Sequence, residues 1–65
     1  MKLKKNKLKQ YRKKLELNQE MLAEMVEVSR QSIISIERGK TTPSLELALK
    51  FSKLFRCKVN DLFGV

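Results

Sequence analysis

The stretch that decides the fold is NQEMLAEMVEVSRQSIISIERGK, residues 18–40. Asn18 is a favourable N-cap, because its side chain accepts a hydrogen bond from a free backbone amide of the first turn, and it predicts a helix to about Met25. Ser29 predicts the start of a second helix in the same way, and Gly39 is typical of the residue that follows a helix end. The stretch therefore predicts two short helices in close succession.

The connection between these two helices is very short. Only Glu27 and Val28 precede the cap Ser29, so the helices must cross steeply, and their contact needs a small residue, which Ala23 supplies. The apolar residues at helical spacing then form a shared core, namely Leu22, Ala23, Val26, Val28, Ile33 and Ile36. This combination predicts a helix-turn-helix.

One more helix is expected before this stretch. Asn6 is a plausible cap for it, and Leu8, Tyr11 and Leu15 share one of its faces. Residues 1–5 ahead of it form a basic segment that is either a short edge strand or an arm, and the sequence leaves both open.

Two more helices are expected after it. Ser44 predicts a helix that runs to about Phe55, and Asn60 opens a last short turn over residues 61–63. No convincing sheet is predicted. The expected fold class is all-α, with five short helices.

The composition predicts one small basic domain over residues 1–65. The chain has 15 Lys and Arg against 7 Asp and Glu, a net charge of +8. Such a balance points to a polyanionic partner, either nucleic acid or an anionic membrane surface. The excess is concentrated in residues 1–14, which hold eight basic residues and no acid.

The composition also excludes several classes of protein. With no His and a single Cys57, the chain cannot form an internal disulfide or an ordinary zinc site, so neither metal nor cofactor is expected. The same lack leaves no acid–base constellation for an enzyme. No apolar run reaches the roughly 18 residues of a membrane span, and the basic start lacks the apolar stretch of a signal peptide. The expected location is the cytoplasm.

The spacing across residues 18–40 resembles the Cro/CI-type (Xre family) DNA-binding domains of phage repressors and prokaryotic regulators. The likeness continues into TTPSLELALKFSKLF, residues 41–55, and CKVNDLF, residues 57–63. It covers roughly residues 6–63. The resemblance implies a lambda-repressor-like fold, with double-stranded DNA as the partner and no catalytic activity.

The resemblance implies that the helix starting after Ser29 lies in the major groove and reads base edges from its N-terminal part. The candidates are Arg30, Gln31, Ser32 and Ser35. Arg pairs bidentately with guanine and Gln with adenine, which suits this role. Ile34 also lies on the outer face, either by chance or to contact thymine methyl groups.

The resemblance further implies phosphate contacts on both sides of this helix. Asn18 and Gln19 are expected on one side, with a simple capping role as the alternative for Asn18. Arg38, Lys40 and Thr41 are expected on the other. The complete set expected at the DNA is Asn18, Gln19, Ser29, Arg30, Gln31, Ser32, Ile34, Ser35, Arg38, Lys40 and Thr41. Members of this family also pair the positions of Arg12 and Glu37, which predicts a structural ion pair.

One residue departs from the family pattern. Members usually place Gly where this chain has Glu27, because the turn residue there adopts a positive φ. Holding a non-glycine residue in that conformation costs about 1–2 kcal/mol. We therefore expect Glu27→Gly to stabilise the domain without weakening DNA binding.

Charges outside this set form two rows. Glu16, Glu20, Glu24 and Glu27 make an acidic stripe, which we interpret as a solvated face that points away from DNA. Lys5, Lys9 and Lys13 are spaced by four and are either a solubilising surface or a source of long-range attraction to DNA.

The helix after Ser44 is apolar over a wider arc than one small core can use. The candidates for a homodimer interface are Leu47, Leu54, Phe63 and Val65. The alternative is that they pack within their own chain. The resemblance implies a dimer that places the two recognition helices, those that start after Ser29, about 34 Å apart on a palindrome. Cys57 stands where the family has a small apolar residue, so a buried, inert thiol is expected.

The sequence therefore predicts a sequence-specific transcription regulator, a repressor that binds a palindromic operator as a homodimer. The alternative is an antitoxin or accessory DNA-binding component that acts with a partner protein. A membrane-surface peptide is disfavoured, because Asn6, Asn18, Ser29 and Pro43 interrupt the long helix that it needs. No small-molecule ligand is expected.

Overall fold

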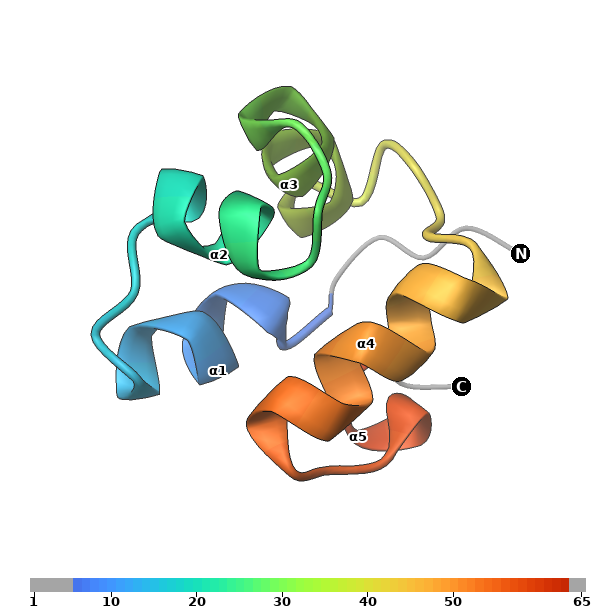
Figure 1. Cartoon of the computed structure of the whole chain (residues 1–65). Coiled ribbons are helices and arrows are strands. Elements are labelled where there is room, and N and C mark those ends of the chain that lie inside the picture. The colour runs from blue at the N-terminus through green and yellow to red at the C-terminus, as the bar shows by residue number, and fades with distance from the viewer. Residues whose placement is uncertain (1–5, 64–65) are drawn as a thin grey trace.

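Five helices with short connections make up residues 6–63, the part of the chain that the computed structural model describes (Figure 1). In chain order they are α1 (Leu8–Lys14), α2 (Gln19–Met25), α3 (Arg30–Glu37), α4 (Leu45–Phe55) and α5 (Val59–Phe63). No strand occurs among these residues, and the all-α prediction is confirmed. The expected arm or strand over residues 1–5 lies outside the described residues.

The starts of α2, α3 and α4 lie where the capping residues predict them. Asn18, Ser29 and Ser44 each accept a side-chain hydrogen bond from the backbone N–H three residues later, at 2.7, 3.1 and 3.2 Å. Each bond satisfies an amide that has no partner inside its own helix. These three predictions are confirmed.

The first helix differs from the prediction that Asn6 caps it, because Lys7 occupies the N-cap position and makes no side-chain cap bond. Its start is fixed instead by Asn6, one residue earlier, and by other parts of the chain. The Asn6 side-chain oxygen accepts from the Leu8 backbone at 3.1 Å, while its Nδ2 donates to the Ile36 carbonyl at 2.7 Å. The Lys7 backbone N–H donates to the Leu62 carbonyl at 2.7 Å. The entry to α1 is therefore tied to both α3 and α5.

The end of α1 differs from the prediction that Leu15 lies on its inward face. The helix ends at Lys14, and the chain turns through Glu16, whose φ is 56°. Leu15 is left 49% exposed, while Leu17 packs against the core. The inward placement of Leu15 is wrong, because the helix stops one residue too early to carry it.

The core of the helix-turn-helix matches the prediction closely. Five of the six expected residues are buried and the sixth, Val28, is partly buried against them; the five are Leu22, Ala23, Val26, Ile33 and Ile36. The helices α2 and α3 lie together, and α4 and α5 pack on the other side of the molecule (Figure 1).

Aromatic side chains join α4 and α5 to this core. Phe51 is fully buried, and its ring centroid lies 6.4 Å from that of Phe55 and 6.1 Å from that of Phe63. Phe63 is only 4% exposed, so it is a core residue and offers no surface to a partner. Its expected place in a dimer interface is wrong, because α5 folds back onto α4. Val65 lies outside the described residues.

The helix α5 begins at Val59, one residue before the predicted opening residue Asn60. The Asp61 carboxylate accepts a hydrogen bond from the Lys58 backbone at 3.0 Å, which closes the first turn. Cys57, in the preceding connection, is half-buried against the core rather than fully buried.

The chemistry of the described residues is limited. Burial raises the pKa of the Cys57 thiol, and the negative charge of Asp61 raises it further, so the reactive thiolate is disfavoured. No three His, Cys, Asp or Glu side chains between residues 6 and 63 gather where they would hold a metal ion. None of the helices in this range has both the length and the apolar character that crossing a bilayer requires.

Candidate nucleic-acid interface

The helix α3 has one buried side and one accessible side. Ile33 and Ile36 point into the core and anchor it against α2. The side chains predicted to read bases all remain exposed, fully or in part: Arg30, Gln31, Ser32, Ile34 and Ser35. The fold therefore presents them together on one helix, where a major groove would meet them.

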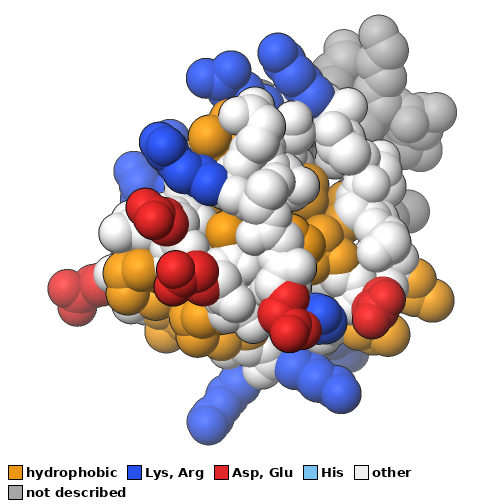
Figure 2. Space-filling model, turned by 45° about the horizontal axis from the view of Figure 1, so that its top comes forward, with side chains coloured by type: hydrophobic (Ala, Val, Ile, Leu, Met, Phe, Trp, Pro, Cys, Tyr) orange, Lys and Arg blue, Asp and Glu red, His pale blue; other side chains and the backbone are white. Residues whose placement is uncertain are grey.

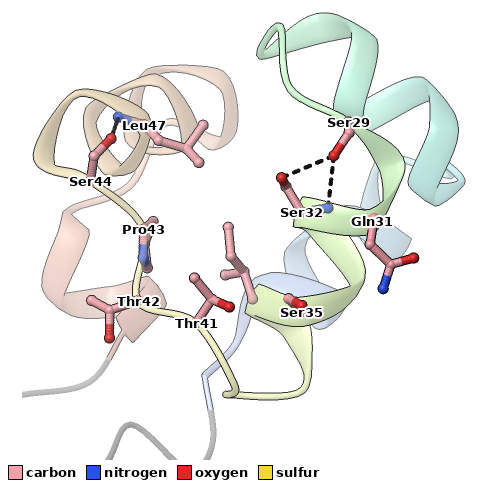
Figure 3. A pocket seen from close by; sticks show the side chains of 10 residues that line it. Ser29, Gln31, Ser32, Ser35, Thr41, Thr42, Pro43, Ser44 and Leu47 are labelled. Carbon is pink, nitrogen blue, oxygen red and sulfur yellow. Dashed lines mark hydrogen bonds between the residues drawn. The ribbon is translucent and has the colours of Figure 1, made fainter.

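The hydroxyls at the start of α3 are engaged within the protein. The Ser29 Oγ accepts from the Ser32 backbone at 3.1 Å and lies 3.0 Å from the Ser32 Oγ (Figure 3). Among the described residues, no side-chain hydrogen bond involves Gln31 or Ser35 (Figure 3). Gln31 is exposed, so its amide is free to pair with a base edge.

A groove of about 290 Å³ runs along one flank of α3, between that helix and the segment that leads into α4 (Figure 3). Its lining carries no charged side chain but is rich in hydroxyls: Ser29, Ser32, Ser35, Thr41, Thr42 and Ser44, together with Gln31, Ile36, Pro43 and Leu47. Short neutral donors of this kind suit close approach to a sugar–phosphate backbone.

The opposite flank of α3 has a different character. A hollow of about 320 Å³ there is lined by residues of α1, α2 and α3: Lys9, Gln19, Arg30, Ile34, Glu37 and Arg38. Three of these six side chains are cationic. Sequence reasoning missed Lys9 in this position, because only the packing of α1 against α3 brings it there.

A buried ion pair joins α1 to α3, as the family pattern predicted. The Arg12 Nε donates to the Glu37 Oε2 at 2.7 Å, and the two side chains are only 8% and 5% exposed. Arg12 also donates to the Glu37 Oε1 at 3.3 Å and to the Leu17 carbonyl at 2.8 Å. The Gln19 Nε2 donates to the same Glu37 Oε1 at 3.1 Å. This network holds the start of α2 against α1 and α3.

The residues predicted to contact phosphates do not form the two groups that were expected. The side-chain oxygen of Asn18 accepts the capping hydrogen bond from the Met21 backbone, and the amide nitrogen takes no part in that bond. Arg38 lines the cationic hollow together with Gln19, whereas Thr41 lines the neutral groove. Lys40 is exposed beyond the end of α3. Arg38 therefore belongs to the same flank as Gln19, not to that of Thr41.

The acidic stripe is exposed, as predicted, although Glu16 stands in the turn before α2 rather than on it. Figure 2 shows acidic side chains in a band across one face of the molecule, with Lys and Arg gathered at its margins. Glu27 belongs to this stripe and pairs with Lys50 of α4 at 3.1 Å, a contact that sequence reasoning missed.

The helix α4 carries apolar side chains at the surface. Leu47 and Leu54, two of the residues predicted for a dimer interface, are partly buried against the core. Leu45 and Leu49 are more accessible, at 73% and 46% exposed. The most exposed apolar surface of α4 therefore lies at these two leucines, which sequence reasoning did not select.

The comparisons with known proteins agree with this geometry. The helix-turn-helix family matches residues 8–62. The chain belongs to this family, and its resemblance to the Cro/CI type is confirmed. It is a DNA-binding helix-turn-helix transcription regulator and not an enzyme.

Its relatives come from archaea and bacteria. An uncharacterised HTH-type transcriptional regulator of Methanocaldococcus jannaschii is 56% identical over 59 residues, which are 91% of this chain and 89% of the relative. The HTH-type regulator YgzD of Bacillus subtilis is 48% identical over the same shares of the two chains. The crystal structure of the restriction-modification controller protein C.AhdI from Aeromonas hydrophila superposes with a TM-score of 0.77 at 30% identity, covering 88% of this chain and 86% of that one.

Proposed function

We propose that this regulator reads a specific double-stranded DNA site with the accessible side of α3. The observation that carries the proposal is Gln31, an exposed amide without a side-chain partner among the described residues, on a helix whose other side is anchored in the core. An amide presented in this way pairs with N6 and N7 of adenine in the major groove.

The rest of the DNA interface follows from the two flanks of α3. Arg30, Ile34 and Ser35 contact bases beside Gln31, with Ile34 placed against thymine methyl groups. The remaining contacts go to the sugar–phosphate backbone on either side of the helix, from Asn18, Gln19, Ser29, Ser32, Arg38, Lys40 and Thr41. These assignments are supported by exposure and by the shape of the two flanks.

We further propose that the protein binds as a homodimer on a palindromic site and acts as a repressor by occupying promoter DNA. The support is the exposed apolar surface of α4, at Leu45 and Leu49, with Leu47 and Leu54 at its border. A dimer of this kind places its two α3 helices about one DNA turn, roughly 34 Å, apart. Because it acts on the chromosome, the protein belongs in the cytoplasm of a prokaryotic cell.

Gln31→Ala tests the proposed base reading. The operator is first selected from random DNA with the unmodified protein, and Kd is then measured on the operator and on single-base variants. We expect the substitution to cost about 1–3 kcal/mol on the operator and to relax preference at one base pair.

Gln10→Ala is the matched control for this experiment, because Gln10 is an exposed glutamine on α1. It should leave both affinity and preference unchanged. If Gln31→Ala instead weakens binding to every sequence by the same factor, Gln31 does not read a base.

A further inference from the structure

The hollow beside α3 gathers positive charge from separate elements. Lys9 is the second residue of α1, Arg30 is the first residue of α3, and Arg38 is the C-cap residue directly after α3. Lys9 is far from the two arginines in the sequence, and it reaches them because Asn6 and Arg12 bond to Ile36 and Glu37 and so tie α1 to the end of α3. The hollow is therefore a product of the fold and not of a local basic run.

The only acid in the lining of this hollow is already neutralised. Both oxygens of Glu37 accept hydrogen bonds from Arg12, and one of them also accepts from Gln19. Within residues 6–63, no carboxylate forms an ion pair with Lys9, Arg30 or Arg38. The hollow thus carries an excess of positive charge in a concave surface, which attracts an anion.

The position of the hollow indicates which anion it takes. It shares Arg30 and Ile34 with the face of α3 that we assign to base reading. A DNA strand that borders the major groove around α3 would pass over it with its phosphates turned toward the protein. The groove on the other flank is lined by uncharged side chains, so it would meet the second strand with different chemistry.

We propose that this hollow seats a backbone phosphate of the bound DNA, and that Lys9, beside Arg38, is the residue of α1 that binds it. This inference rests on the proposed function. It gives two lysines of α1 different roles, because Lys9 lines the hollow whereas Lys13, one turn later and also exposed, is not among its lining residues. It also makes the two flanks of α3 unequal, with salt-sensitive contacts concentrated on the α1 side.

Lys9→Ala and Lys13→Ala test this seat as a matched pair, because each removes one positive charge from an exposed position on α1. Affinity for the selected operator and for an unrelated duplex is measured over a range of salt concentration. One phosphate contact contributes about 0.9 to the slope of log affinity against log salt. We expect Lys9→Ala to lower this slope by about that amount on both duplexes, and to weaken binding to both by the same factor. Lys13→Ala should leave the slope unchanged.

Three results would overturn the inference. Equal loss of slope in both variants would mean that α1 contributes only general charge. An unchanged slope in Lys9→Ala would mean that Lys9 touches no phosphate, and a change of preference at one base pair would make it a base-reading residue. Affinity for the unrelated duplex does not depend on base reading. A Gln31→Ala result that contradicts the proposed function would therefore leave open whether the hollow binds a phosphate, which the salt dependence of Lys9→Ala decides. Thermal melts of both variants should match that of the unmodified protein, since both side chains are exposed.

Discussion

Glu27 holds the turn between α2 and α3 in a left-handed conformation, with a φ of 62°. The family pattern predicted this conformation, which costs a non-glycine residue about 1–2 kcal/mol. The ion pair of Glu27 with Lys50 offsets only part of this cost, because the two side chains are 79% and 37% exposed. An exposed pair of this kind contributes about 0.2–1 kcal/mol.

Glu27→Gly should therefore stabilise the protein. Glycine relieves the left-handed strain, while the lost ion pair and the greater freedom of glycine in the unfolded chain offset part of the gain. We expect a net gain of up to about 1 kcal/mol, which corresponds to a rise in melting temperature of at most about 4–8 °C in a domain of this size. Glu24→Gly is the control: it lies inside α2, so it should lower the melting temperature instead. A Glu27→Gly protein that melts below the unmodified one contradicts this view of the turn.

The hydrogen-bond network around Glu37 fixes how α1, α2 and α3 are placed against one another. The Glu37 carboxylate of α3 accepts hydrogen bonds from Arg12 of α1 and from Gln19 of α2. Arg12 also donates to the carbonyl of Leu17, which lies in the connection between α1 and α2. Because Arg12 and Glu37 are almost completely buried, each charge depends on the other for compensation.

Glu37→Gln should be strongly destabilising, because it leaves the Arg12 guanidinium buried without a counter-charge. Removing one partner of a buried pair costs about 3–5 kcal/mol. Glu27→Gln is the matched control, since it makes the same change in the exposed pair with Lys50 and should cost less than about 1 kcal/mol. The free energy of unfolding in urea measures both variants. Equal losses in the two would show that burial of the Arg12 pair contributes nothing special.

The elements also show what the sequence can predict. The starts of α2, α3 and α4 were predicted correctly because capping is local: Asn18, Ser29 and Ser44 bond to amides only three residues away. The start of α1 and the burial of Phe63 depend on contacts between distant segments, such as the bond from Lys7 to the carbonyl of Leu62. Local patterns do not contain that information.

In the candidate interface, too, the sequence predicts what local periodicity determines and misses what the packing of distant segments determines. The outward face of α3 was predictable, because helical periodicity with Ile33 and Ile36 inward leaves Gln31 outward. The two flanks of α3 were not, because they depend on where α1 and the α4 connection pack. The sequence therefore placed Arg38 with Thr41, and only the structure separates them.

For the molecule as a whole, the net charge of +8 is a poor guide to the reading surface. The base-reading face of α3 is mostly neutral, the groove beside it is uncharged, and an acidic stripe lies on the outer side of α2. Positive charge enters the interface mainly through the hollow next to α1. In the complex that we propose, overall charge sets the rate of approach and the salt dependence, while a few side chains on α3 set the specificity.

The proposed homodimer depends on the exposed apolar surface of α4. Leu49→Glu places a charge in the exposed apolar surface of α4, so we expect it to separate the protomers and to weaken operator binding. Leu15→Glu is the matched control, because Leu15 is also a leucine of similar exposure, 49% against 46%, but lies at the end of α1. Sedimentation equilibrium measures the mass of each variant, and circular dichroism checks that both remain folded. An unmodified protein that sediments as a monomer at all concentrations contradicts the dimer, and a Leu49→Glu protein that stays dimeric moves the interface away from this part of α4.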